Sequence, residues 1–244
     1  KQKTAYEIKD GPFNDCGAFG SPNWLEFDPK YPHLVYVAAD RGAGDENEGN
    51  GNMRILDLKN QYVGTALTEG DMGGTNRGRA LAFFDENHMA VAVDQGDELR
   101  AAVYGFTRNR EAPEGDERNY KMWGNRLALV NFKACNTVTF HPVDGDMYFN
   151  SWDKGQFFKV EKQQIQEIFD GTRTTPADKE VLFQMDNGWE YNIRIHPTGN
   201  YAYIVSINKH YIQRTNYDWA SKRFVTPFIV AGTAERAAYV DGIG

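Results

Sequence analysis

Several aromatic side chains in this sequence stand close to acidic, amide or basic residues, and this combination can bind sugars. The C–H faces of a sugar stack on aromatic rings, while its hydroxyl groups need rigid polar partners. The candidate ligand-binding residues are Trp24, Trp152, Trp189 and Tyr191, with Arg79, Asp153 and Asn208 as hydrogen-bonding neighbours. The alternative is that each aromatic ring packs inside the fold, so the elements that carry these residues decide their role.

The segment 41–52 is rich in Gly, Asp, Asn and Glu, and it partly matches a calcium-binding loop. Asp45, Asn47 and Gly49 give it a faint similarity to the early positions of such a loop. The twelfth position of the loop needs a bidentate glutamate, and this chain has Leu56 there. We therefore expect a solvated loop, with calcium as the alternative, and assign no metal ligand and no cofactor.

Four segments share one pattern, in which a short strand, a polar turn and a second apolar strand follow each other. They are Asn23–Ala39, Gly78–Val93, Asn136–Trp152 and Tyr191–Ile207. The last apolar residues before the turns, here called the anchors, are Phe27, Phe83, Phe140 and Ile195. Successive anchors are 56, 57 and 55 residues apart. The turns are rich in Pro, Asp, Asn and Gly, which is typical of β-hairpins.

Each repeat continues with two further predicted strands, which gives four strands per unit. These strands are expected at Asn52–Leu58, Tyr62–Leu67, Leu99–Thr107, Arg126–Asn131, Phe157–Val160, Val181–Gln184, Tyr211–Thr215 and Arg223–Ala231. One helix is expected at Glu161–Asp170, with Gly171 at its C-terminal cap. A repeated unit of four antiparallel strands is the blade of a β-propeller. We predict an all-β propeller with four recognisable blades, and a β-sandwich is the alternative fold.

The composition argues against several classes of protein. The formal net charge is −7 and no Lys/Arg cluster offsets it, so we expect no nucleic-acid partner. No apolar run of about 18 residues occurs, so no transmembrane segment is predicted. Cys16 and Cys135 form no metal-binding or redox motif, and both a disulfide and two free thiols stay open.

The histidines recur in a way that argues against a metal enzyme. His33, His88, His141 and His196 fall in the first hairpin turn of successive repeats. In a propeller these turns radiate outwards, so we expect a role in each turn and no shared metal ion. The chain also contains no GxSxG, GxGxxG or phosphate-binding P-loop motif. We therefore assign no catalytic residue.

Two stretches resemble a known family. They are CGAFGSPNWLEFDPKYPHLVYVAAD (Cys16–Asp40) and YIQRTNYDWASKRFVTPFIVAGTAERAAYVDGIG (Tyr211–Gly244). Both resemble the NHL-repeat propellers of IPT/TIG-domain surface lipoproteins from glycan-utilising Gram-negative gut bacteria. The resemblance implies a six-bladed ring and an N-terminal IPT/TIG domain. It also implies a place at the cell surface or in the periplasm, with a lipid anchor to the outer membrane in the full-length protein.

The chain departs from this family at both ends. Residues 1–11 are too short for an IPT/TIG domain, and we expect a linker there. The propeller is expected over residues 12–244, with blades at about 20–70, 76–132, 135–186 and 189–232. Residues 233–244 then lead into a missing blade. The first and last blades of such a fragment present exposed edges.

The candidate residues fall in loops that share one end of a propeller, here called the loop face. These loops enter the inner strands or join the second and third strands. We hypothesise a non-catalytic surface protein that binds a polysaccharide or oligosaccharide there, with outer-membrane transport proteins as further partners. One alternative is a metal-dependent hydrolase or lyase that uses Glu26, Glu190 and Asp153, unless these pair with Arg79 or Arg194. Another is a protein–protein interaction module.

Overall fold

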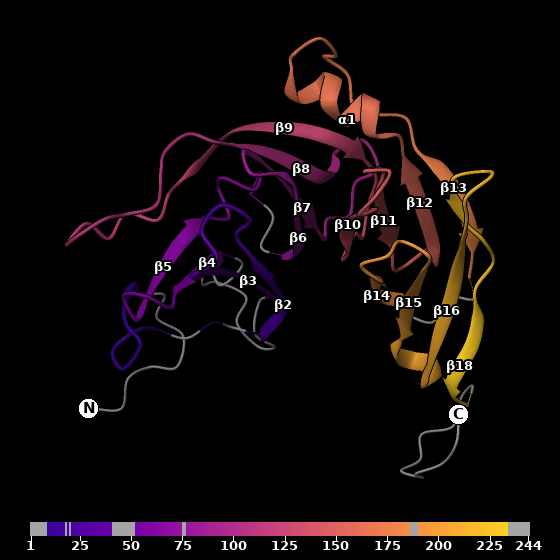
Figure 1. Cartoon of the computed structure of the whole chain (residues 1–244), viewed down its shortest axis with the longest axis horizontal. Coiled ribbons are helices and arrows are strands. Elements are labelled where there is room, and N and C mark those ends of the chain that lie inside the picture. The colour runs from indigo at the N-terminus through magenta and orange to yellow at the C-terminus, as the bar shows by residue number, and fades with distance from the viewer. Residues whose placement is uncertain are drawn as a thin grey trace.

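The computed structural model describes residues 9–17, 19, 21–40, 52–74, 77–185 and 190–233, without the side chains at positions 21, 39, 40, 190 and 191. Four antiparallel sheets follow one another along the chain and stand around a common opening as an arc (Figure 1). This arrangement confirms the predicted all-β propeller with four blades.

Each blade is a sheet whose strands follow in chain order from the inside of the arc outwards. Blade I contains β2 (Ser21–Phe27), β3 (Leu34–Asp40), β4 (Met53–Asp57) and β5 (Tyr62–Leu67). Blade II contains β6 (Gly78–Asp85), β7 (His88–Val93), β8 (Ala101–Arg108) and β9 (Trp123–Asn131). Blade III contains β10 (Val138–Phe140), β11 (Met147–Ser151), β12 (Gln156–Val160) and β13 (Glu180–Gln184). Blade IV contains β14 (Glu190–Ile195), β15 (Tyr201–Ser206), β16 (Tyr211–Asp218), β17 (Arg223–Phe224) and β18 (Phe228–Gly232).

The structure differs from the predicted strands at two places. A short strand that the sequence pattern does not predict, β1 (Gly11–Pro12), pairs with the outer strand β5. The single strand expected at Arg223–Ala231 is divided, and its two parts β17 and β18 both pair with β16. Pro227 lies between the two parts. Because proline has no backbone N–H to donate, it is confined to edges and bulges of a sheet, and here it interrupts the edge strand.

The repeat predicted from the anchors has a direct counterpart in strand register. In all four blades the anchor pairs with an early residue of the second strand. The pairs are Phe27 with Val35, Phe83 with Met89, Phe140 with Met147 and Ile195 with Ala202. Hydrophobic spacing in the sequence therefore sets the same hairpin register four times.

A β-bulge recurs near the start of three inner strands, four residues before the anchor. The register shifts at Asn23 in β2, at Arg79 in β6 and at Tyr191 in β14. A bulge leaves one residue outside the ladder of hydrogen bonds, and bulges often stand next to functional sites. Two of the bulge residues, Arg79 and Tyr191, are candidate ligand-binding residues. The fold places both where an inner strand begins.

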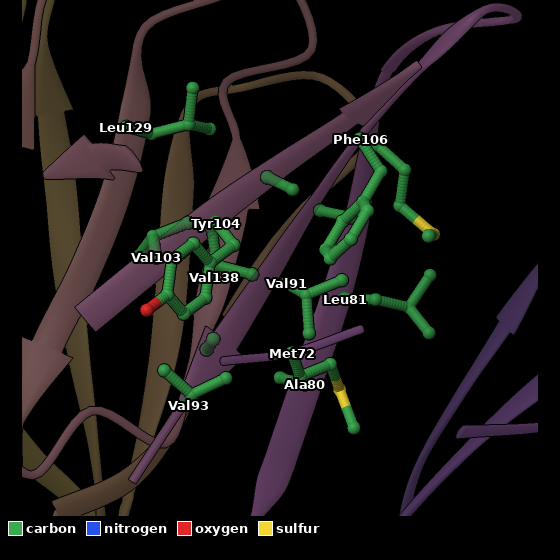
Figure 2. Close-up of a cluster of buried hydrophobic side chains, with 14 of the residues drawn as sticks. Met72, Ala80, Leu81, Val91, Val93, Val103, Tyr104, Phe106, Leu129 and Val138 are labelled. Carbon is green, nitrogen blue, oxygen red and sulfur yellow. The ribbon is translucent and has the colours of Figure 1, made fainter. Parts of the chain in front are cut away.

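The hydrophobic core lies between neighbouring blades. One cluster of buried side chains joins blades I, II and III, and a second joins blades III and IV. Figure 2 shows part of the first cluster, including Val91 and Val103 of blade II and Val138 of blade III. Because each blade buries one face against the next, the blades hold each other in position, and loops at their ends are fixed relative to one another.

The predicted helix is present as α1 (Lys162–Phe169), on the outside of the arc beside β9 and β12 (Figure 1). Its residues Ile165 and Ile168 are buried, as the helical spacing predicts. Gly171 follows the helix with a φ of 74°, the left-handed conformation that favours glycine after a helix end. Among the described residues, no helix has both the length and the apolar character needed to cross a lipid bilayer.

The outward faces of the two terminal blades expose large apolar side chains. On β2, Leu25 and Phe27 are 56% and 59% exposed. On blade IV, Tyr203, Val205 and Ile212 are each 40% exposed. These faces stand at the two ends of the arc (Figure 1). In blades II and III the corresponding faces pack against neighbouring blades, so the terminal faces have the character of blade interfaces.

Three of the four recurrent histidines bind groups within their own turns. Nδ1 of His88 lies 2.9 Å from an Asp85 carboxylate oxygen, and Nδ1 of His196 lies 2.8 Å from the Thr198 hydroxyl. Nδ1 of His141 accepts backbone N–H groups two and three residues ahead of it. For these three residues the predicted role in the turn is confirmed.

Both cysteines are free thiols, and Cys135 is buried. Burial raises the pKa of the Cys135 thiol from 9.0 to about 12. Thiolates are the reactive form, so we expect a disulfide reagent at about pH 9 to modify Cys16 in the native protein and Cys135 only after unfolding. Because the unfolded thiol loses its proton first, the contribution of Cys135 to stability falls as pH rises between these two values.

Counting thiols with the same reagent in native and denatured protein tests this expectation. A Cys16→Ser variant should show no fast-reacting thiol in the native state and one after denaturation. Fast modification of Cys135 in the folded protein would contradict its buried position.

Candidate ligand-binding site

The loops of blades II and III form a hollow of about 470 Å³ on the loop face. We call it the Trp152 pocket; its charged and aromatic lining residues are Arg77, Asp94, Arg100, Lys133, Trp152 and Asp153. The lining comes from two loops that enter inner strands and two that join second and third strands. These are the two kinds of loop in which the candidate residues were expected. The pocket brings together three of those candidates, because Arg79 lies directly behind the lining.

Asp94, at the end of β7, connects the basic and aromatic parts of the pocket. Its side chain is 8% exposed, and its Oδ2 lies 3.1 Å from Arg77 Nη1 and 2.8 Å from Arg79 Nη2. From the next blade, Trp152 Nε1 donates a hydrogen bond to Asp94 Oδ1 at 3.2 Å. A buried carboxylate held by charged donors is a strong and directional acceptor. Asp94 therefore fixes the Trp152 indole relative to the two arginines.

Asp94 directly follows the second strand of its blade, where an acidic side chain can bond its own turn, but it does not do so here. Its carboxylate binds side chains from the start of β6 and from blade III instead. The sequence alone cannot show whether an acidic side chain at this position bonds its own turn or distant side chains. The partners of Asp94 lie 15 to 58 residues away along the chain.

Lys133 and Asp153 form an ion pair within the lining of the pocket. Lys133 Nζ lies 3.1 Å from Asp153 Oδ2, and the Ser151 hydroxyl donates to Asp153 Oδ1 at 2.8 Å. The hydrogen bond to Asp153 raises the pKa of Lys133, and Glu98 adds a smaller effect in the same direction. Lys133 is therefore a cation over the whole physiological pH range, as lysine ordinarily is.

The backbone at Ala134 joins the loops of the pocket to one another. Its N–H donates to the Gln95 carbonyl at 2.8 Å, and its carbonyl accepts the N–H of Trp152 at 2.9 Å. Ala134 has a φ of 53°, in the left-handed region that costs a non-glycine residue about 1–2 kcal/mol. The two hydrogen bonds hold this conformation, and they keep Lys133 and Trp152 on adjacent sides of the hollow.

Arg100 stands at the rim of the pocket, just before β8. Its Nη2 donates to the Gly73 carbonyl at 2.8 Å. Gly73 has a φ of 84°, and a Cβ atom there would come within 2.6 Å of the Tyr104 hydroxyl, so only glycine fits this turn. Among the residues that the structure describes, no carboxylate pairs with Arg100. The sequence patterns single out neither Arg100 nor Lys133.

Trp24 is not part of this pocket and lines a separate hollow of about 580 Å³ together with Arg194. Its ring is 4% exposed, and the Arg194 guanidinium carbon of blade IV lies 3.7 Å from the ring centroid. Arg194 Nη1 also lies 3.7 Å from Glu26 Oε2. Burial raises the pKa of Glu26, and the charge of Arg194 offsets part of that rise. In this arrangement the Trp24 ring is covered by protein, and Glu26 is paired with Arg194, one of the two arginines expected to pair with it.

The remaining candidates are not part of the Trp152 pocket. Asn208 is exposed in the short 3-10 turn η1 (Ile207–Lys209) between β15 and β16. Trp189 lies outside the described residues. Asp45, Asn47 and Gly49, for which calcium binding was the alternative, also lie outside them. The side chains of Glu190 and Tyr191 are outside them as well.

The described part of the chain contains no group of three or more His, Cys, Asp or Glu side chains that could hold a metal ion. Asp153, which was considered for a channel metal, is paired with Lys133 instead. The pocket itself offers cations, one indole and two engaged carboxylates. Such a lining is suited to binding and orienting a polar ligand.

Comparison with known proteins finds relatives among solved structures alone. No family model matches the chain, and no curated protein matches it. An auxiliary nutrient binding protein from Bacteroides thetaiotaomicron is 32% identical, with a TM-score of 0.75, over 98% of this chain and 48% of its own. A second, from Bacteroides ovatus, is 26% identical, with a TM-score of 0.73, over 98% of this chain and 49% of its own.

A third similar structure carries a different description. It is called a "Putative phosphatase" from Bacteroides thetaiotaomicron and is 29% identical, with a TM-score of 0.81, over 97% of this chain and 52% of its own. This chain therefore spans about half the length of each of the three proteins. Over that half it shares their propeller fold.

Proposed function

We propose that this chain is the ligand-binding propeller of a cell-surface nutrient-binding protein, and that the nutrient is a glycan held in the Trp152 pocket. The observation that carries the proposal is the partly exposed Trp152 indole, fixed by Asp94 beside a hollow with polar groups from several loops. The similarity to two auxiliary nutrient binding proteins supports the same function.

The pocket has the two components that sugar recognition requires. The indole offers an apolar surface for the C–H face of a sugar ring. Arg100, Lys133 and Asp153 stand around it and can accept or donate hydrogen bonds to hydroxyl groups. Because the indole is hydrogen-bonded and its backbone N–H is also engaged, little side-chain entropy is lost on binding, which favours affinity.

The rest of the proposal concerns the protein that contains this propeller. The exposed apolar faces of blades I and IV support a larger ring, in which further blades cover Leu25 and Phe27 at one end and Tyr203 at the other. The resemblance to NHL-repeat propellers of IPT/TIG-domain surface lipoproteins supports a six-bladed ring. It also supports a lipid anchor in the outer membrane and transport proteins there as partners.

A phosphoester hydrolase is the second candidate, because one similar structure is described as a phosphatase. Arg77, Arg100 and Lys133 would suit a phosphate group. Such a reaction also needs a nucleophile or an activated water. Asp94 is engaged by two arginines and an indole, and Asp153 by Lys133, so both carboxylates favour a binding site over this reaction.

A glycan array followed by calorimetry tests the proposal. We expect Trp152→Ala to weaken binding of an identified glycan about 10-fold or more, and Trp152→Phe to weaken it less because a ring remains. Trp219→Ala is the matched control. Trp219 is 45% exposed and bonds Asn200 Oδ1 through its indole, but it follows β16 at the opposite end of the blade.

Two results would count against a glycan-binding role at this site. One is a glycan affinity that Trp152→Ala leaves unchanged. The other is turnover of p-nitrophenyl phosphate that Arg77→Gln abolishes, because that result would establish the second candidate.

A further inference from the structure

We infer that the Trp152 pocket selects glycans that carry an acidic group, either the carboxylate of a uronic acid or a sulfate ester. This inference rests on the proposed glycan-binding function and names the class of glycan. It also assigns the recognition of the acidic group to Arg100, with Lys133 and Arg77 as neighbours.

The local charge of the pocket is opposite to that of the chain. The whole chain carries a formal net charge of −7. In the pocket lining, three cations stand beside two carboxylates; Arg79 adds a fourth cation behind Asp94, and Glu98 adds a third carboxylate near Lys133, which leaves an excess of one positive charge. Cations gathered in a hollow on an acidic protein create a local positive potential that attracts anions.

The lining cations remain accessible although two of them are paired. The side chain of Arg77 is 45% exposed while it contacts the buried Asp94, and that of Lys133 is 23% exposed while it contacts Asp153. Each carboxylate thus holds its cation in place without removing it from the surface. A ligand anion that binds here meets groups that are already oriented.

Arg100 is the cation whose charge the described structure compensates least. Its hydrogen bond goes to the neutral Gly73 carbonyl, and no described carboxylate pairs with it. That bond orients the guanidinium in a lining that also includes Gly96, where a Cβ atom would meet nothing within 4 Å. The open space lets a bulky charged group approach. A guanidinium binds carboxylate and sulfate oxygens through two parallel hydrogen bonds.

A neutral sugar would use only the hydrogen-bonding capacity of these residues and not their charge. Its hydroxyl groups can bond to Asp94, Asp153 or Arg100, but they would leave the positive potential unused. A cluster that keeps Arg100 without a carboxylate partner close to Lys133 and Arg77 costs mutual repulsion, and an anionic group would relieve it. The aromatic ring and the cations together therefore favour an acidic sugar.

Paired probes that differ in charge alone test the inference by calorimetry. The first pair is polygalacturonate and its fully methyl-esterified form, and the second is chondroitin sulfate and its desulfated form. The first pair isolates the carboxylate and the second isolates the sulfate. A set of neutral polysaccharides, including xyloglucan, galactomannan and starch, completes the panel. We expect polygalacturonate, chondroitin sulfate or both to bind about 10-fold or more tightly than the methyl-esterified or desulfated counterpart.

Two variants at opposite ends of β8 locate the effect. We expect Arg100→Gln to remove about 10-fold of the preference for the charged probe. Arg110→Gln is the matched control, because Arg110 follows the same strand at its other end and pairs with Glu117. It removes the same charge from the protein and should leave the preference unchanged. Arg100 is exposed and Arg110 is half-buried, and neither side chain packs in the core, so circular dichroism should show the wild-type fold for each variant.

The outcomes separate this inference from the proposed function. Equal binding of the two members of both pairs, or binding confined to neutral polysaccharides and lost in Trp152→Ala, would overturn the acidic preference and leave glycan binding in place. A preference that survives Arg100→Gln would overturn the assignment to this pocket. If none of the probes in the panel binds, both the proposed function and this inference are overturned.

Discussion

Replacing Asp28 by asparagine is expected to lower the free energy of unfolding by about 3–5 kcal/mol. Asp28 and Arg108 form an ion pair between blades I and II, with side chains that are 0% and 2% exposed. Arg108 Nη2 lies 2.9 and 3.0 Å from the two carboxylate oxygens, and the Tyr36 hydroxyl donates to Oδ2 at 2.9 Å. The substitution would leave the Arg108 cation buried without its counter-charge.

The same two blades supply a control at the protein surface. Lys30 and Glu111 also connect blade I with the segment after β8, at 2.7 Å, but the Glu111 side chain is 69% exposed. Glu111→Gln should cost less than about 1 kcal/mol, because water screens the pair. Urea unfolding followed by circular dichroism measures both variants. Equal losses for the two would contradict a buried link between the blades.

His141→Ala is expected to cost about 3 kcal/mol, through a cavity and through backbone groups left without partners. Nδ1 of His141 accepts the N–H groups of Val143 and Asp144, so its proton is on Nε2, which donates to the Gly199 carbonyl of blade IV at 3.0 Å. The ring is buried and stacks on Tyr217 with 4.1 Å between centroids. One side chain therefore closes its own turn and binds the next blade.

His196 gives a matched control, because it follows the anchor of blade IV as His141 follows the anchor of blade III. Its Nδ1 bonds the Thr198 hydroxyl in an exposed turn. His196→Ala should cost about 1 kcal/mol or less, since the lost bond is exposed to water. The same urea experiment compares the two variants. A loss at His196 as large as that at His141 would show that the contact between blades adds nothing.

The repeat could be predicted from the sequence because its cause is local. Alternating apolar residues before and after a polar turn fix each hairpin, and the anchors Phe27, Phe83, Phe140 and Ile195 occupy one register position. The helix followed from Ile165 and Ile168 at helical spacing. The division of the last strand at Pro227 has an equally local cause, which the prediction overlooked.

The site was predicted less completely because its contacts cross from blade to blade. Trp24 and Trp152 look alike in the sequence, but Arg194 of blade IV covers Trp24 while Asp94 of blade II holds Trp152 at a hollow. The two partners lie 170 and 58 residues away along the chain. Lys133 and Arg100 join the pocket for the same reason. The pattern of apolar residues within one repeat does not show which residue of the next blade lies opposite a given side chain.

The crystal structure of the protein with an oligosaccharide identified on the array tests the central claim most directly. We predict electron density for a sugar ring stacked on the Trp152 indole, with polar contacts to residues of the Trp152 pocket such as Lys133 or Arg100. Density for the sugar at another place, with the Trp152 ring facing solvent alone, would contradict the claim that this pocket is the binding site.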